Sequence, residues 1–161
     1  MRITLAALLL LFTTPAFAEL EVRFREGAPK DRFTISNRAA CPVADTVLTI
    51  DLEGSAAALI FDTTGAGAGV EVFQPFAVVE GRDALASEPV VRDGDRAIAL
   101  PIRFLAPGGR IAFTIDVDDT VEKRGITVSD SEIRGASVRL EGRSGTFRNG
   151  PVARVQTPAC D

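Results

Sequence analysis

The stretch IAFTIDVDDT at residues 111–120 decides the fold. Isoleucine, phenylalanine, isoleucine and valine occupy its odd positions up to 117, whereas alanine, threonine and two aspartates occupy its even positions. This strict period of two, with β-branched and aromatic residues on the apolar side, is typical of a half-buried β-strand. A Pro-Gly-Gly turn precedes the stretch and three acids crowd its end. We therefore predict a strand that is buried on one face and ends in carboxylates.

The remaining chain reads as further short strands between turns. We expect strands at 20–24, 32–36, 47–53, 56–61, 97–104, 136–140 and 152–155, with shorter extended pieces at 126–128, 133 and 146–147. Pro75 interrupts the apolar run 70–79, which predicts an edge strand, a bulge or two short strands there. Apolar residues do not recur at helical spacing over a dozen positions. The fold class predicted is all-β, an antiparallel β-sandwich of immunoglobulin-like type.

The N-terminus has the pattern of a secretory signal peptide. A positive start, an apolar run at 3–12 and an Ala-Phe-Ala site ending at Ala18 follow one another. The alternative, a retained membrane anchor, is disfavoured because spanning a bilayer takes roughly 20 apolar residues. We expect residues 1–18 to be removed and residues 19–161 to form a single β-sandwich domain. The mature protein is expected to be secreted or periplasmic, with no membrane insertion after cleavage.

Composition excludes several function classes. The chain carries 18 basic and 22 acidic residues, a net charge of −4, and removal of Arg2 with the leader gives −5. Basic residues are scattered, so nucleic acid is not an expected partner. Histidine, tryptophan and tyrosine are absent from the sequence. Ser-His-Asp and Cys-His catalysis and histidine-ligated metals are thereby excluded, and no catalytic residues or organic cofactor are predicted.

The chain has two cysteines, Cys41 and Cys160. In an oxidising compartment an even count predicts a disulfide, and two free buried thiols are the alternative. A bridge between them would close a loop of over a hundred residues, which the chain-entropy model values at about 4–5 kcal/mol. It would also hold a C-terminus that otherwise frays.

The acids at the end of the 111–120 stretch are the candidate metal ligands. Asp116 and Asp118 share one face, and Asp119 follows directly. Clustered carboxylates suit Ca²⁺, which takes six to eight oxygen ligands and tolerates irregular loops. The alternatives are a solvated strand end and catalytic carboxylates. Asp51 and Glu53 lie at another strand end and could join only if the fold brings them near.

Two other features permit a functional interpretation. Phe73 and Phe76 flank the break at Pro75, where they either pack in the core or form an exposed interface. The glycine-rich segment 65–69 is either a tight turn or a phosphate cradle. A cradle needs a following helix and a Lys-Ser/Thr pair, which the sequence lacks, so we favour the turn.

Five segments carry a resemblance to a known group of proteins. They are Asp31-Arg32-Phe33 with Asn37 and Cys41, TIDLEGSAAALIFD (49–62), GAGVEVFQPF (67–76), TIDVDDT (114–120) and SEIRGA (131–136). Together they resemble small exported alphaproteobacterial proteins labelled as similar to a sponge aggregation factor core protein. The resemblance spans most of the mature chain. It implies cell-surface adhesion or calcium-dependent association, and it implies no site residues.

These observations lead to three functional hypotheses. The first is an exported, non-enzymatic binding or adhesion domain, assisted by Ca²⁺, with a protein or glycan partner at the cell envelope. The second is a carboxylate-dependent hydrolase of extracellular polymers. Such an enzyme would need a sugar cleft, and the chain lacks the Trp and Tyr that usually line one. The third is a structural or assembly subunit with an open strand edge near Pro75.

Overall fold

The computed structural model describes residues 18–67, 69, 73–121 and 128–160. Within these ranges the strands and one 3-10 helix are β1 (Glu19–Arg25), β2 (Asp31–Asn37), β3 (Val43–Asp51), β4 (Ile60–Asp62), β5 (Ala77–Glu80), η1 (Arg82–Ala84), β6 (Ala97–Leu105), β7 (Arg110–Asp118), β8 (Ser137–Leu140), β9 (Arg143–Thr146) and β10 (Val152–Gln156). The same ranges hold no helix long and apolar enough to cross a bilayer. Residues 1–17 of the predicted leader, which ends at Ala18, and the expected strand residues 126–127 lie outside them.

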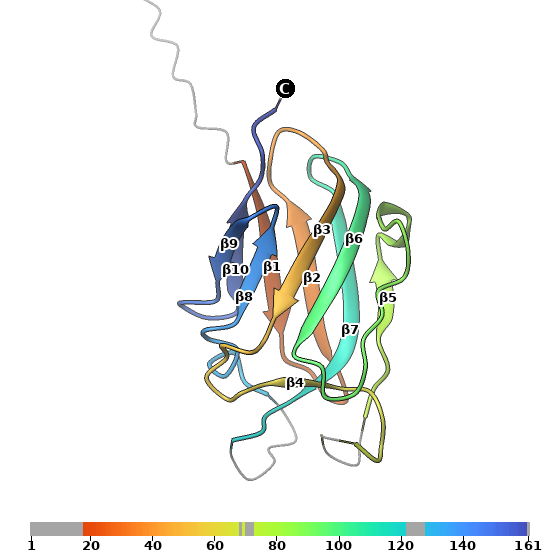
Figure 1. Ribbon diagram of the computed structural model, residues 1–161, viewed down its shortest axis with the longest axis vertical. Coiled ribbons are helices and arrows are strands. Elements are labelled where there is room, and N and C mark those ends of the chain that lie inside the picture. The colour runs from red at the N-terminus through yellow and green to blue at the C-terminus, as the bar shows by residue number, and fades with distance from the viewer. Residues whose placement is uncertain (1–17, 68, 70–72, 122–127, 161) are drawn as a thin grey trace, which may run out of the picture.

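The described strands form two antiparallel sheets packed face to face (Figure 1). One sheet has the order β10-β1-β2-β7-β4, and β5 also pairs with β7. The other has the order β6-β3-β8-β9. This confirms the predicted all-β, antiparallel sandwich. The assignment to the immunoglobulin-like type stays a prediction.

The aromatic core follows directly from strand register. Phe24 in β1 lies opposite Phe33 in β2, which lies opposite Phe113 in β7. The ring centroids of Phe24 and Phe33 are 5.1 Å apart, as are those of Phe33 and Phe113, whose planes are nearly parallel. Cross-strand aromatic pairs stabilise a sheet beyond the area they bury. The alternation of the 111–120 stretch therefore places Phe113 at the centre of the core.

Strand β7 is the hub of its sheet. It pairs with β2 along residues 110–115, with β5 along 112–114 and with β4 along 116–118. The alternation predicted that only one face of β7 is buried. Ala112, Asp116 and Asp118 on the even face are buried as well. Three neighbouring strands and the chain that follows β4 account for this, and none of them is visible from local alternation.

Two expected strands are wrong in part. Of the run 56–61 only the last two residues belong to a strand, β4 (Ile60–Asp62), because the preceding residues form a turn in which Ala58 has a φ of 49°. Ile133 lies in a turn rather than an extended piece. That turn is closed by Ser129 and Glu132. The Glu132 carboxylate accepts the Ser129 backbone N–H and hydroxyl, and the Glu132 backbone N–H donates to the Ser129 carbonyl at 3.0 Å.

The two cysteines form the predicted disulfide. Their Cα atoms are 5.7 Å apart across a sequence separation of 119. The bridge joins the β2–β3 connection to the C-terminal segment, which lie at the end of the molecule opposite β4 (Figure 1). Beside it, the buried Asn37 side chain donates to the carbonyls of Cys41 and Leu105 at 2.8 and 2.9 Å. The disulfide and the Asn37 amide therefore secure one end of the sandwich.

Candidate metal centre

Three aspartates meet at the end of the sandwich where β4 pairs with β7. Asp62 is directly opposite Asp116 in the antiparallel register, and Asp118 is two residues further along the same face of β7. One carboxylate oxygen from each of the three lies within 4.8 Å of the others. We call Asp62, Asp116 and Asp118 the carboxylate cluster.

The carboxylate cluster is buried, in contrast to the solvated strand end considered from the sequence. Asp62 is 0%, Asp118 4% and Asp116 8% exposed. Like charges directly opposite each other destabilise a strand pair, and burial adds a desolvation cost. Three buried carboxylates this close together are stable only if protons, hydrogen-bond donors or a cation compensate their negative charge.

Hydrogen bonding leaves one oxygen of the carboxylate cluster unsatisfied. Asp62 Oδ1 accepts the backbone N–H of Thr64 at 3.2 Å. Asp62 Oδ2 is buried and has no hydrogen-bond partner among the described residues. The carboxyl groups close to it are those of Asp93 and Asp118. Because two ionised carboxylates cannot hydrogen-bond each other, a contact of this oxygen with the Asp93 or Asp118 carboxyl group requires a shared proton or a cation between them.

A glycine packs tightly against the same oxygens. A Cβ atom at Gly69 would stand 2.2 Å from Asp62 Oδ2 and 2.3 Å from Asp118 Oδ2. One at Gly67 would stand 1.6 Å from Asp93 Oδ2. The glycine-rich turn therefore runs against carboxylates, which would repel a phosphate and favour a cation.

Asp31 extends the negative charge at this end. It begins β2, is 2% exposed, and accepts the backbone N–H groups of Gly27 at 3.0 Å and Val117 at 3.1 Å. The second bond satisfies a β7 amide beyond the end of the β2 pairing. Asp31 thus positions the part of β7 that carries Asp116 and Asp118.

The electrostatics of the group follow from burial and proximity. Burial raises the pKa of Asp31 to about 8, with Asp116 and Asp118 adding to the rise and its two N–H donors opposing it. Burial raises the pKa of Asp62 to about 7, and the Asp93 and Asp118 carboxyls add to it. Burial, then the Asp118 charge, raises the pKa of Asp116 to about 6. A divalent cation would oppose all three shifts by stabilising the ionised forms.

The spacing of the carboxylate cluster is compatible with one calcium ion. Ca²⁺–oxygen bonds of 2.3–2.6 Å place two ligands of one ion no more than about 5 Å apart, and the three oxygens all lie within 4.8 Å of one another. The donor set of hard carboxylate oxygens also suits Ca²⁺.

The structure brings together two of the three ligands predicted from sequence. Asp116 and Asp118 belong to the carboxylate cluster, whereas Asp119 follows β7 and lies outside the group of three. Asp51 is on the other sheet, where its carboxylate is 2.7 Å from the Arg139 guanidinium. Metal binding by Asp116, Asp118 and Asp119 stays a prediction.

Sequence reasoning missed Asp62 and Asp31. Asp62 directly follows the apolar run 56–61, and this position was the only sequence feature that pointed to it as a site residue. Its role depends on pairing with a strand more than fifty residues away, which local patterns do not specify. Asp31 gave no signal beyond its place at the start of a strand.

The two predicted interface phenylalanines have different environments. Phe73 is 41% exposed. Phe76 packs against the core, with its ring centroid 5.1 Å from that of Phe113. In addition, the carbonyl of Gln74, between them, accepts the backbone N–H of Asp116 at 3.3 Å. Phe73 thus lies on a segment that contacts the carboxylate cluster.

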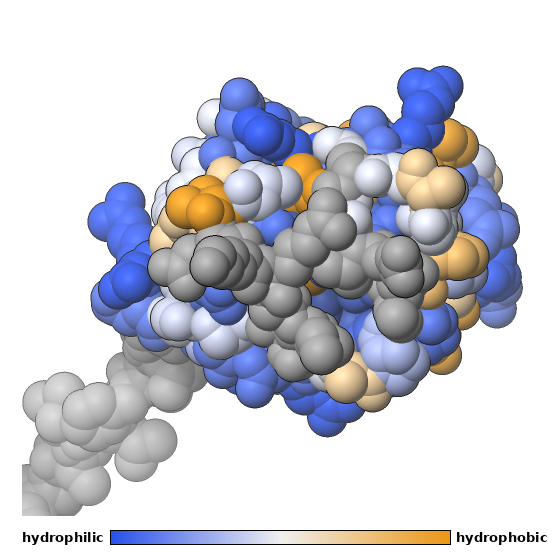
Figure 2. Space-filling model, turned by 90° about the horizontal axis from the view of Figure 1, so that it is seen from below, coloured by the Kyte–Doolittle hydropathy of each residue, from blue (hydrophilic) through white to orange (hydrophobic). Residues whose placement is uncertain are grey.

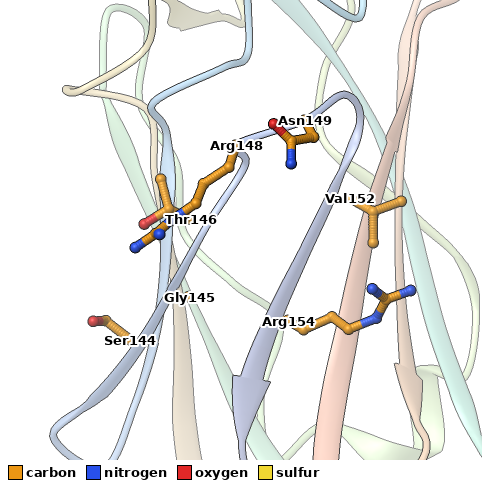
Figure 3. A pocket seen from close by; sticks show the side chains of 7 residues that line it. All are labelled: Ser144, Gly145, Thr146, Arg148, Asn149, Val152 and Arg154. Atoms are coloured by element: carbon orange, nitrogen blue, oxygen red, sulfur yellow. The ribbon is translucent and has the colours of Figure 1, made fainter.

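The surface offers shallow polar pockets elsewhere. One of about 430 Å³ lies along the seam between β9 and β10 (Figure 3) and is lined by Ser144, Gly145, Thr146, Arg148, Asn149, Val152 and Arg154. Figure 3 shows Arg148 and Arg154 extending in opposite directions. Arg154 is paired with Glu19 and Glu21 at 3.2 and 2.9 Å. No carboxylate lines this pocket, so it lacks the acid pair of a glycoside hydrolase.

Figure 2 views the molecule from the end where β4 lies. The described part of this face is mostly hydrophilic, with hydrophobic residues in separate small patches. Comparison with protein-family models, with curated proteins and with solved structures gives no match. The functional argument therefore rests on the carboxylate cluster itself.

Proposed function

We propose that this chain is an exported, non-enzymatic binding domain of adhesion type that holds Ca²⁺ at the carboxylate cluster. It acts at the cell surface or in the periplasm, on a protein or glycan of the envelope. The observation that carries the metal part is the buried Oδ2 of Asp62, which lies beside Asp116 and Asp118 and has no hydrogen-bond donor among the described residues. The disulfide is compatible with an oxidising compartment outside the cytoplasm.

Burial also weighs against the hydrolase alternative. Each aspartate of the carboxylate cluster is less than a tenth exposed, so a polymer cannot reach it in this conformation. Hydrolysis of a glycosidic bond requires the two carboxyl groups to flank the bond. A metal ion needs no such access once it is bound. Among the residues that the structure describes, no observation favours the assembly-subunit alternative over a binding domain.

Calorimetric titration with Ca²⁺ tests the proposal. We expect one ion per chain, with a dissociation constant on the order of 10⁻⁴ to 10⁻³ M, the range of extracellular calcium modules. Asp118→Asn should weaken binding at least tenfold because it removes a buried anionic ligand. The matched control is Asp119→Asn, which changes the neighbouring acid and should leave the isotherm unaltered.

The outcome that overturns the metal part is an isotherm for the wild-type protein without binding heat or with several weak surface sites. The partner part is tested by retention of envelope proteins and glycans on the immobilised domain in calcium and in chelator. Retention that is equal in the two buffers, or equal for wild type and Asp118→Asn, would contradict calcium-assisted binding.

A further inference from the structure

One of the connections between the two sheets, from β3 to β4, ends at the carboxylate cluster. Strand β3 ends at Asp51 in one sheet, and β4 begins at Ile60 in the other. Figure 1 shows β4 lying across one end of the sandwich. We call residues 52–62 the crossover. It is part of the core, because Leu52, Leu59 and Phe61 are each 0% exposed.

Regular pairing between the crossover and β7 is short. Its strand portion pairs with β7 over three residues, compared with eight register partners between β3 and β6. Other backbone bonds join the crossover to segments outside β7, such as the N–H groups of Leu52 and Phe61 to the carbonyls of Arg96 and Asp95 at 2.7 and 2.9 Å. Its attachment to β7 and the residues that follow it therefore rests on the short pairing and on Thr120, which donates to the Ala57 and Ala58 carbonyls at 3.1 and 2.8 Å.

The crossover ends at the least favourable register position of the pair. Asp62 lies opposite Asp116, so two buried acids oppose each other at the end of the short strand β4. Without a cation, repulsion acts to separate β4 from β7. With a divalent ion between them, the same carboxylates become ligands that join the crossover to the hub strand of its sheet.

We infer that the bound cation clamps the crossover against β7, so that this end of the sandwich is closed in calcium and opens when calcium is withdrawn. The inference rests on the proposed function and assigns the ion a regulatory role. The opposite end needs no ion because the disulfide secures it. The two ends of one core therefore respond to different conditions, one to redox state and one to calcium.

Hydrogen–deuterium exchange of the wild-type protein tests the clamp. Deuterium uptake is compared in millimolar calcium and in chelator, for peptides from the crossover and for control peptides from β8 and β9. We expect the crossover amides to exchange at least about tenfold faster in chelator, whereas the control peptides change less than about twofold. Asp118→Asn should exchange rapidly in both buffers, and Asp119→Asn should behave as wild type.

Each result distinguishes the clamp from the metal site. Absence of calcium binding by calorimetry removes both the proposed function and the clamp. Binding of one ion with unchanged crossover exchange removes the clamp alone. A uniform slowing of exchange in every peptide also contradicts the clamp, because it would show global stabilisation rather than local closure.

Discussion

Replacing Asp62 by asparagine should have opposite effects in the absence and presence of calcium. Asparagine keeps an oxygen for the Thr64 N–H and places an NH₂ group where Oδ2 has no partner. This amide can donate to the neighbouring carboxylates. We therefore expect Asp62→Asn to be more stable than wild type in chelator at pH 8, and to lose the stabilisation by calcium.

The magnitude follows from the electrostatics of the buried group. A pKa of about 7, against the ordinary value of 3.8, means that the fold disfavours the ionised Asp62 by about 4 kcal/mol at pH 8. Relaxation of the neighbouring acids reduces this, so we expect a gain of about 2 to 4 kcal/mol. For a domain of this size that is a rise in Tm of roughly 5–15 °C.

Calcium should stabilise the wild-type protein more than Asp62→Asn. At about 100 times the dissociation constant, an ion that binds only the folded state adds about 2.7 kcal/mol to wild type. Asp62→Asn should gain little, because it has lost one of three anionic ligands. Thermal unfolding by circular dichroism, with chelator and with calcium, measures all four values, and Asp119→Asn serves as the matched control.

The reasoning is refuted if Asp62→Asn is less stable than wild type in chelator. That result would mean that Oδ2 already has a donor and that the buried carboxylate contributes to stability without an ion. A variant that keeps the full calcium response would equally contradict the assignment of Asp62 as a ligand.

Three further predictions concern pH, the disulfide and the turn. In chelator, the unfolding free energy should fall as pH rises from about 4 to 8, because the raised pKa values of the buried aspartates make the folded state bind more protons than the unfolded chain. The expected slope is about 1.4 kcal/mol per pH unit for each such proton. Urea titrations measure this slope, and calcium should make it smaller. Replacing Cys41 and Cys160 together by serine should cost about 3–5 kcal/mol in the same titrations, and an unchanged midpoint would contradict a stabilising bridge. Gly69→Ala should weaken calcium binding at least tenfold by calorimetry, since its Cβ would occupy the space beside two ligand oxygens; wild-type affinity would argue against a cation at that place.

The sequence predicted those parts of the fold that depend on local alternation. Strands around Val22, Ile35 and Phe113 were found because each places every second residue in the core. Of strand β9 the sequence predicted only the last residue, Thr146, because Arg-Ser-Gly-Thr has no apolar alternation. Gly145 in this strand lies close to the Arg154 carbonyl, where a Cβ would stand only 1.9 Å from the oxygen, and such a long-range approach has no local sequence signal.

Two of the three aspartates in the carboxylate cluster could be named from the sequence. Asp116 and Asp118 stand out because they follow an unmistakable strand, and their shared face is a property of the strand alone. Asp62 and Asp31 could not be added because they approach through pairing of distant strands. Asp119 was included because it is adjacent in sequence, but adjacent residues in a strand end point in different directions.

Crystallography with anomalous scattering tests the central claim most directly. Crystals grown in calcium, with data collected at long wavelength, should show one anomalous peak between Asp62, Asp116 and Asp118, with ligand oxygens at about 2.3–2.6 Å. Crystals that show no peak there, with the three carboxyl groups buried and close together as they are now, would contradict a calcium site in this protein.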